Sequence, residues 1–100
     1  MDRSAGDKPT GVAKPLASEL SRVLPPFRVM LHNDDHNDAL FVVRTIVELT
    51  PLSAAFARDV MVEAHTGGVA QVLVTHKERA ELYQEQFASK GLCVTIEPAT

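Results

Sequence analysis

Residues 31–38 read Leu31-His32-Asn33-Asp34-Asp35-His36-Asn37-Asp38, and seven of these eight side chains donate or accept hydrogen bonds. The apolar run 27–31 enters this stretch with the alternation of a strand, and the apolar run 39–49 leaves it with the spacing of a helix. A strand-to-helix connector does not require so many polar side chains as these neighbouring aspartates, two histidines and two asparagines. The stretch is therefore the first candidate for a functional site.

The pattern of apolar residues and breakers predicts six elements outward from this stretch. They are a strand over 27–32, helices over 39–49 and 54–65, a strand over 69–75, a helix over 77–89 and a strand over 92–96. Candidate caps and breakers are Asn37 or Asp38, Thr50-Pro51, Ser53, Gly67-Gly68, a Thr75–Glu78 capping box, and Gly91. The order β-α-α-β-α-β predicts a small α+β sandwich with its helices against one face of the sheet.

The N-terminal segment differs in composition from the rest of the chain. Residues 1–25 are rich in Gly, Pro, Lys, Asp and Ser early on, which predicts a flexible extension, with a helical turn or two over 16–24. Pro25-Pro26 stops any helix and begins an extended segment, so we place the domain boundary there. Residues 26–100 form the predicted core domain.

Composition narrows the class of protein. One hundred residues with 45% apolar side chains suit one domain, and a net charge of -3 argues against a general nucleic-acid binder. The single cysteine, Cys93, allows neither an internal disulfide nor a multi-cysteine metal site, and we expect it to be a structural thiol in the last strand. No apolar run approaches the ~20 residues of a membrane span. We expect a cytoplasmic protein.

His65 offers a partner for the polar stretch. If the helices over 39–49 and 54–65 lie antiparallel, the end of the second returns to the start of the first, next to Asn33, Asp34 and Asp35. Amide and imidazole acceptors together with carboxylates suit a ligand ammonium group. The alternative is that these residues only cap a helix while His65 is solvated at a helix end.

Two enzymatic interpretations have less support. His32, Asp34, Asp35, His36 and His65 have the ligand types of a zinc or manganese site, but their spacing matches no recognised metal motif. No Ser, Cys or Thr lies in a recognised nucleophile turn, and Gly67-Gly68 alone is not a phosphate loop. The sequence therefore predicts no catalytic residue, no metal and no cofactor.

The sequence resembles the ClpS family, adaptors of the bacterial Clp protease that recognise N-degrons. The resemblance lies in the run 29–35, in Phe41-Val42-Val43, and in Met61 and His65 followed by glycine. It covers roughly residues 26–99 without a gap. The most specific feature is the Asn-Asp-Asp turn with a histidine 32 positions after Asn33.

The resemblance implies a three-stranded antiparallel sheet with three helices, and a monomer without enzymatic activity. It implies binding of the first residue of a peptide, usually Phe, Tyr, Trp or Leu, and delivery to a Clp AAA+ ATPase. Glu78 would contact the N-terminal domain of a ClpA-like partner, and residues 1–25 would assist delivery. The α-amino group would lie near Asn33, Asp34, Asp35 and His65. The side-chain pocket would be lined by Leu31, Asn37, Ala39, Val42, Met61, Ala64 and Leu92.

Three positions depart from the family pattern. The family usually has Met at Ala39 and often Val at Ala64, so we expect a roomier pocket that favours aromatic residues over Leu, unless Met61 or a shifted Leu40 refills it. Tyr83 stands where a Lys often assists the ATPase contact, so the partner could be a different Clp ATPase. If His65 accepts a hydrogen bond from the ammonium, binding should weaken as histidines protonate below neutral pH.

Two other functions stay open at this level. One is a generic α+β protein-interaction domain without an amino-terminus pocket. The other is a metal-dependent hydrolase built on His32, Asp34, Asp35 and His65. Neither nucleic acid nor a membrane is an expected partner.

Overall fold

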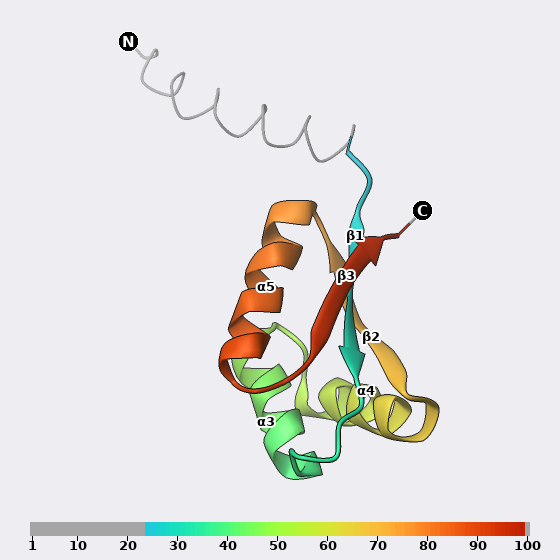
Figure 1. Cartoon of the computed structure of the whole chain (residues 1–100), viewed down its shortest axis with the longest axis vertical. Coiled ribbons are helices and arrows are strands. Elements are labelled where there is room, and N and C mark those ends of the chain that lie inside the picture. Colours follow the sequence, from blue (N-terminus) through green and yellow to red (C-terminus); the bar gives the residue numbers. More distant parts are fainter. Residues whose placement is uncertain (1–23, 100) are drawn as a thin grey trace.

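The computed structural model describes residues 24–99 and confirms the predicted α+β fold (Figure 1). The elements are β1 (Phe27–His32), α3 (Ala39–Leu49), α4 (Ala54–Gly67), β2 (Val69–Thr75), α5 (Lys77–Ser89) and β3 (Val94–Pro98). The order β-α-α-β-α-β is as predicted. The expected extension over 1–25, with its helical turns over 16–24, lies outside the described residues except for Leu24 and Pro25.

The sheet has the strand order β2-β1-β3, and both pairings are antiparallel. The central strand β1 is therefore hydrogen-bonded on both sides, which fixes the direction in which its end leads into the polar loop. Leu31 pairs with Ala70 on one side and Val94 on the other. A register shift between Val29 and Met30 marks a β-bulge in the pairing with β2.

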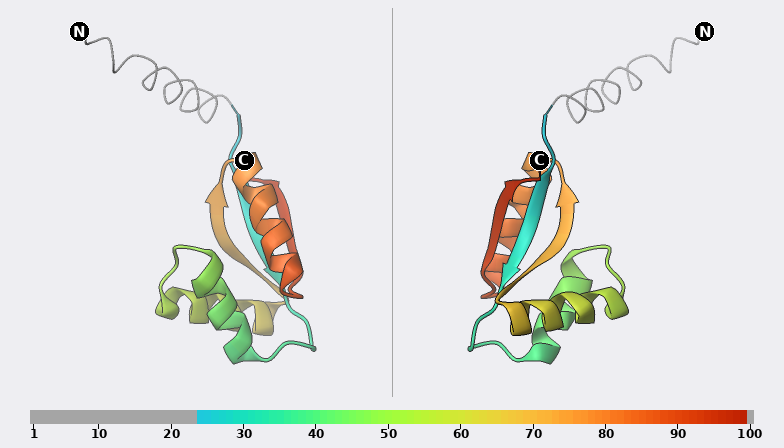
Figure 2. Two further views of the ribbon diagram at one scale, coloured as in Figure 1. Left: turned by 90° about the vertical axis from the view of Figure 1, so that its left-hand side faces the viewer. Right: turned by 90° about the vertical axis from the view of Figure 1, so that its right-hand side faces the viewer.

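The helices are arranged in two groups. Helix α5 runs along one face of the sheet, whereas α3 and α4 pack together at the end of the sheet where β1 finishes (Figure 2). Only α5 therefore covers the sheet in the way that the sequence predicted for all three helices. One hydrophobic core connects all six elements, and its most enclosed large side chains are Val29, Ile46 and Phe87.

The helix caps agree with the sequence in two cases and differ in the third. Asp38 caps α3 by accepting from the Phe41 N–H at 2.9 Å, and Ser53 caps α4. Helix α5 is capped by His76, whose Nδ1 accepts from the Arg79 N–H at 3.3 Å, so the predicted Thr75 capping box is wrong. Thr75 is unavailable as a cap because it still pairs with β1 in the sheet.

The last strand begins two residues later than predicted. The Leu92 N–H donates to the Phe87 carbonyl at 3.0 Å, so this residue completes the end of α5 instead of starting β3. Cys93 consequently lies before β3 and is exposed, so its predicted place as a structural thiol in the last strand is wrong. The apolar pattern of 77–89 places Leu82 inside with Ala80, Tyr83 and Phe87. Leu82 is in fact 43% exposed, because α5 faces the core with the other three residues. Within residues 24–99, no helix is long and apolar enough to cross a membrane.

Candidate functional site

The polar loop 33–38 starts where β1 separates from its two neighbours. The His32 N–H donates to the Cys93 carbonyl at 3.0 Å, and the next N–H, of Asn33, donates to the Gly68 carbonyl at 2.9 Å. The first bond leads to the segment before β3, and the second leads to the end of α4. The start of the loop is therefore held between two parts of the chain that are distant in sequence.

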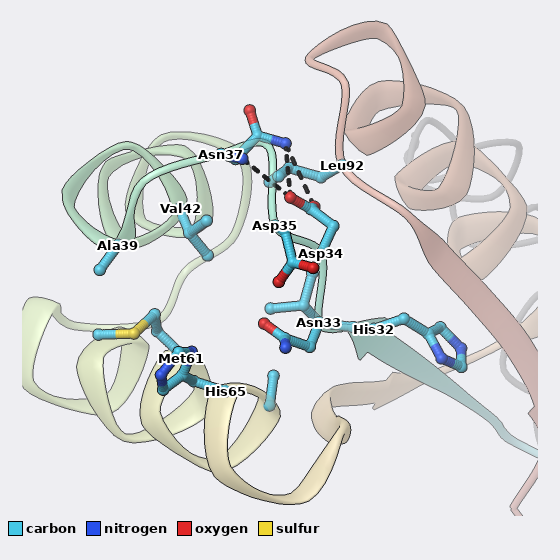
Figure 3. Close-up of a pocket in the computed structure, with 12 residues that line it drawn as sticks. His32, Asn33, Asp34, Asp35, Asn37, Ala39, Val42, Met61, His65 and Leu92 are labelled. Atoms are coloured by element: carbon cyan, nitrogen blue, oxygen red, sulfur yellow. Dashed lines mark hydrogen bonds between the residues drawn. The ribbon is translucent and has the colours of Figure 1, made fainter.

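Asp34 organises the interior of the loop. Its Oδ1 accepts from the backbone N–H groups of His36 and Asn37, both at 2.9 Å. Its two oxygens also accept from the Asn37 side-chain Nδ2 at 3.3 and 3.2 Å (Figure 3). This is the turn that an aspartate forms with backbone donors two and three residues later. The Asp34 carboxylate is thus largely used within the protein.

The surroundings of Asp34 lower the pKa of its carboxyl group. Desolvation raises this pKa. It is outweighed by hydrogen bonds from the backbone and side chain of Asn37 and from the His36 backbone, and by the charge of His36. The result is a pKa below the usual 3.8. Asp34 therefore stays ionised at neutral pH and keeps accepting all of these bonds.

A cavity of about 250 Å³ lies between this loop, α3, α4 and the α5–β3 turn. It is smaller than the ~300–1,000 Å³ of pockets that hold drug-sized ligands, so it suits a single side chain with its backbone group. It brings together every residue that the family resemblance placed around the α-amino group and in the side-chain pocket. The lining residues are Leu31, His32, Asn33, Asp34, Asp35, Asn37, Ala39, Val42, Met61, Ala64, His65 and Leu92.

The polar residues of the cavity gather on one side. Asn33 and Asp35 come from the loop, and His65 comes from the last turns of α4, as expected from the return of the second helix (Figure 3). All three residues are exposed, and the hydrogen bonds within residues 24–99 involve none of their side chains. These acceptor groups are therefore free to meet a ligand.

The apolar residues form the inner and opposite walls. Leu31, Ala64 and Leu92 are 2–3% exposed and form the inner surface. Val42 and Met61 are half-buried beside them, whereas Ala39 is exposed at the rim. The arrangement offers hydrogen-bond acceptors and negative charge next to an apolar space, which suits a cation attached to an apolar group.

The residues of the metal hypothesis are not brought together. His32 borders the cavity, but its ring points away from it, and its Nε2 lies 2.7 Å from the Thr95 hydroxyl (Figure 3). Across residues 24–99, no three His, Cys, Asp or Glu side chains form a group that could hold a metal ion. The combination of His32, Asp34, Asp35 and His65 proposed from the sequence is therefore not a metal centre.

One contact of the site was not predicted from the sequence. The Asn37 side-chain Nδ2 also donates to the Gly91 carbonyl at 3.0 Å, which joins the loop to the α5–β3 turn. The Asp34–Asn37 spacing is a recognisable turn signal, but nothing local in the sequence points to a partner 54 residues away.

Comparison with known proteins gives a consistent result. The family model for the ATP-dependent Clp protease adaptor protein ClpS matches residues 23–95. The ATP-dependent Clp protease adapter protein ClpS of Synechococcus elongatus is 41% identical over 88 residues, covering 87% of this chain and 93% of that protein. The chloroplastic CLPS1 adapter of Arabidopsis thaliana is 36% identical over 78 residues, covering 77% of this chain and 49% of that protein.

A solved structure is similar to this fold. Agrobacterium tumefaciens ClpS2 bound to L-phenylalaninamide matches with a TM-score of 0.68 and 31% sequence identity. The match covers 74% of this chain and 96% of that chain.

Proposed function

The chain belongs to the ClpS family of adaptor proteins for the Clp protease, which are not enzymes, and from this we propose that it binds the first residue of substrate proteins. The observation that carries the proposal is the cavity with free acceptors on one side and buried apolar walls on the other. The related ClpS2 binds L-phenylalaninamide, a ligand that combines a free α-amino group with a benzyl side chain.

The acceptor side of the cavity suits a protein's free α-amino group. An ammonium group has three N–H donors, and the Asn33 amide oxygen, a neutral His65 nitrogen and the Asp35 carboxylate provide three acceptors. The oxygens of Asp34 already accept from His36 and Asn37, so Asp34 contributes to amine binding by stabilising the loop and by its negative charge. Acetylation of the amine removes its charge and two donors, leaving these acceptors unpaired at a large cost.

The apolar walls suit a bulky hydrophobic side chain of the Phe, Tyr, Trp and Leu class. Each Å² of apolar surface that the ligand buries against Leu31, Val42, Met61, Ala64 and Leu92 contributes ~25 cal/mol. A β-branched side chain is widest at its Cβ, close to the amine-binding loop, and fits least well there.

Delivery requires a second surface. Glu78 is exposed in the first turn of α5, at the opposite end of this helix from Gly91 and the cavity. A ClpA-like N-terminal domain that contacts Glu78 would leave the cavity open. We propose that a monomer of core domain 26–100 carries the substrate in this way in the cytoplasm, and that residues 1–25 assist the transfer.

The proposal predicts that Asn33→Ala and His65→Ala weaken binding of a Phe-initiated peptide without unfolding the protein. Loss of a hydrogen bond to a charged group corresponds to about 10- to 100-fold in Kd. Calorimetric titration measures the Kd, and thermal unfolding checks the fold. His36→Ala is the control, since its backbone bond to Asp34 is kept and its side chain does not line the cavity.

Two results would contradict this assignment. One is unchanged binding in both Asn33→Ala and His65→Ala. The other is an equal loss in the His36→Ala control, which would mean that loop disturbance, not contact with the amine, governs affinity.

Delivery is tested separately with Glu78→Ala. This variant should bind the peptide as the wild type does while slowing Clp-dependent degradation of a Phe-initiated reporter. Normal degradation with Glu78→Ala would remove Glu78 from the proposed contact.

A further inference from the structure

We propose that Asn37 is a positioning residue. It holds the loop 33–38, which would bind the amine, at a fixed position relative to the apolar wall of the cavity. It does so by joining the Asp34 carboxylate in the loop to the Gly91 carbonyl in the α5–β3 turn. This inference rests on the proposed function and adds a role for a residue that the sequence placed only in the pocket wall.

The amide group of Asn37 uses both of its N–H donors. One side of the Nδ2 group faces the two oxygens of Asp34 at 3.2 and 3.3 Å, and the Gly91 carbonyl lies 3.0 Å from the same nitrogen. The Asn37 backbone N–H donates to Asp34 as well, at 2.9 Å. The amide therefore has a defined orientation, with its donors toward Asp34, as Figure 3 shows.

The turn on the other side of this bridge positions a wall of the cavity. Gly91 has a φ of 84°, a left-handed conformation that glycine adopts without strain, and its N–H donates to the Ala88 carbonyl at 2.9 Å. The next residue, Leu92, is 3% exposed and lines the cavity. The Asn37 side chain is therefore bonded to the residue directly before Leu92 in the cavity wall.

A second bond joins the same two parts of the chain one residue before the loop, where the His32 N–H donates to the Cys93 carbonyl at 3.0 Å. The loop is otherwise bonded to itself through Asp34, to α3 through Asp38, and to the end of α4 through the Asn33 N–H. No other hydrogen bond links residues 33–38 to the α5–β3 turn in this part of the chain. Without Asn37, residues 34–38 would have no direct bond to the α5–β3 turn, and only the start of the loop would remain joined to it through His32 and Cys93.

Two variants separate a positioning role from a wall role. Asn37→Leu keeps a side chain of similar size in the wall and removes both donors, whereas Asn37→Ala removes the donors and the wall together. Both should raise the Kd for a Phe-initiated peptide, by about tenfold, because two bonds to strong acceptors are lost. Asp38→Asn is the control in the same loop, since an asparagine oxygen can still cap α3.

The bridge also has readouts that need no peptide. NMR titration of the Asp34 carboxyl should show a higher pKa in Asn37→Leu than in the wild type, because a hydrogen bond to the charged form is lost. Exchange of the His36 and Asn37 amide protons should become faster in the same variant. The pair Asn37→Leu and Asp34→Ala should be non-additive in Kd, since both remove the same contact.

Each outcome decides the inference. A higher Asp34 pKa with faster amide exchange and weaker peptide binding in Asn37→Leu supports it. Wild-type affinity in Asn37→Leu overturns it, as does an unchanged Asp34 pKa with unchanged exchange. A wild-type protein that binds no Phe-initiated peptide overturns the proposed function instead, and the NMR measurements then still test the bridge.

Discussion

Asp34 and Asp35 are adjacent and chemically identical, but the loop gives their carboxylates different surroundings. Asp34 accepts four hydrogen bonds from His36 and Asn37, whereas the hydrogen bonds of residues 24–99 do not involve the Asp35 side chain. The first carboxylate therefore shapes the loop, and we assign the direct attraction of a ligand ammonium to the second.

The lowered pKa of Asp34 predicts how stability depends on pH. A carboxyl whose folded-state pKa lies below its usual 3.8 stabilises the fold fully above that value, and the stabilisation is lost as pH falls through the folded-state pKa. Asp34→Ala should therefore lower Tm at pH 7, and the difference from the wild type should shrink when pH is brought below 3.8. Thermal unfolding by circular dichroism at both pH values measures this. Asp35→Ala is the matched control and should leave Tm nearly unchanged.

Ala39 and Ala64 set the predicted preference among hydrophobic side chains. Ala64 is 3% exposed in the inner wall and Ala39 lies at the rim. Leu40 does not refill this space, since it is 63% exposed and borders a separate groove on the outer side of α3 and α4. Met61 remains as a flexible side chain that lines the cavity.

We expect the wild type to bind Phe-initiated peptides more tightly than Leu-initiated ones. The double variant Ala39→Met with Ala64→Val should raise the affinity for Leu-initiated peptides relative to Phe-initiated ones by about three- to tenfold. The larger side chains regain contact with the ligand equal to about two methyl groups. Competition titrations with Phe, Tyr, Trp, Leu and Ile peptides measure the order. Equal affinity of the wild type for Leu and Phe would show that the alanines do not enlarge the usable pocket.

At the scale of the elements, the end of α4 depends on two neighbouring glycines in different conformations. Gly67 is the last helical residue, and Gly68 has a φ of 92° and donates its N–H to the Ala64 carbonyl at 2.8 Å. An added Cβ at either position would meet nothing within 4 Å. Substitution effects at this end therefore come from the backbone conformation and not from crowding.

Gly68→Ala should destabilise the fold by roughly 1–2 kcal/mol, the cost of a left-handed L-residue. Gly67→Ala should instead stabilise it by roughly 0.5–1 kcal/mol, since alanine favours the helix. In a domain of this size, 1 kcal/mol corresponds to a Tm shift of about 4–8 °C. The pair serves as its own control, and thermal unfolding gives the sign. A fall in Tm of the same size for both variants would contradict the conformational explanation.

The sequence predicted the elements best where local signals agree. The bounds of β1, α3, β2 and α5 follow from periodicity bounded by Asp38, Thr50-Pro51 and the Gly67-Gly68 turn. The errors concern where elements begin and end. Helix α4 runs to Gly67, where Gly68 caps it, and β3 starts at Val94 because Leu92 completes the end of α5. His76 replaces Thr75 as a cap because Thr75 still pairs with the distant strand β1.

The site was predictable to the extent that it follows from the positions of these elements. Asn33 and His65 line the same cavity because the end of α4 returns to the start of the loop, which an α-α pair implies. The use of Asp34 within the loop and the bond from Asn37 to Gly91 depend on side-chain orientation and on a partner 54 residues away. Those contacts leave no periodic signal in the sequence.

At the scale of the whole molecule, the fold separates two surfaces. The cavity lies where β1 meets α3, α4 and the end of α5, whereas Glu78 lies at the start of α5. If Glu78 contacts the ATPase as proposed, this separation allows substrate and ATPase to be bound at the same time.

The central claim is that the cavity recognises a free α-amino group together with a bulky side chain. The most direct test titrates the protein with one Phe-initiated peptide in two forms, with a free and with an acetylated N-terminus. We predict saturable binding of the free peptide and at least a hundredfold weaker binding of the acetylated one, because several charge-assisted bonds are lost together. Equal affinity for the two forms would contradict the account.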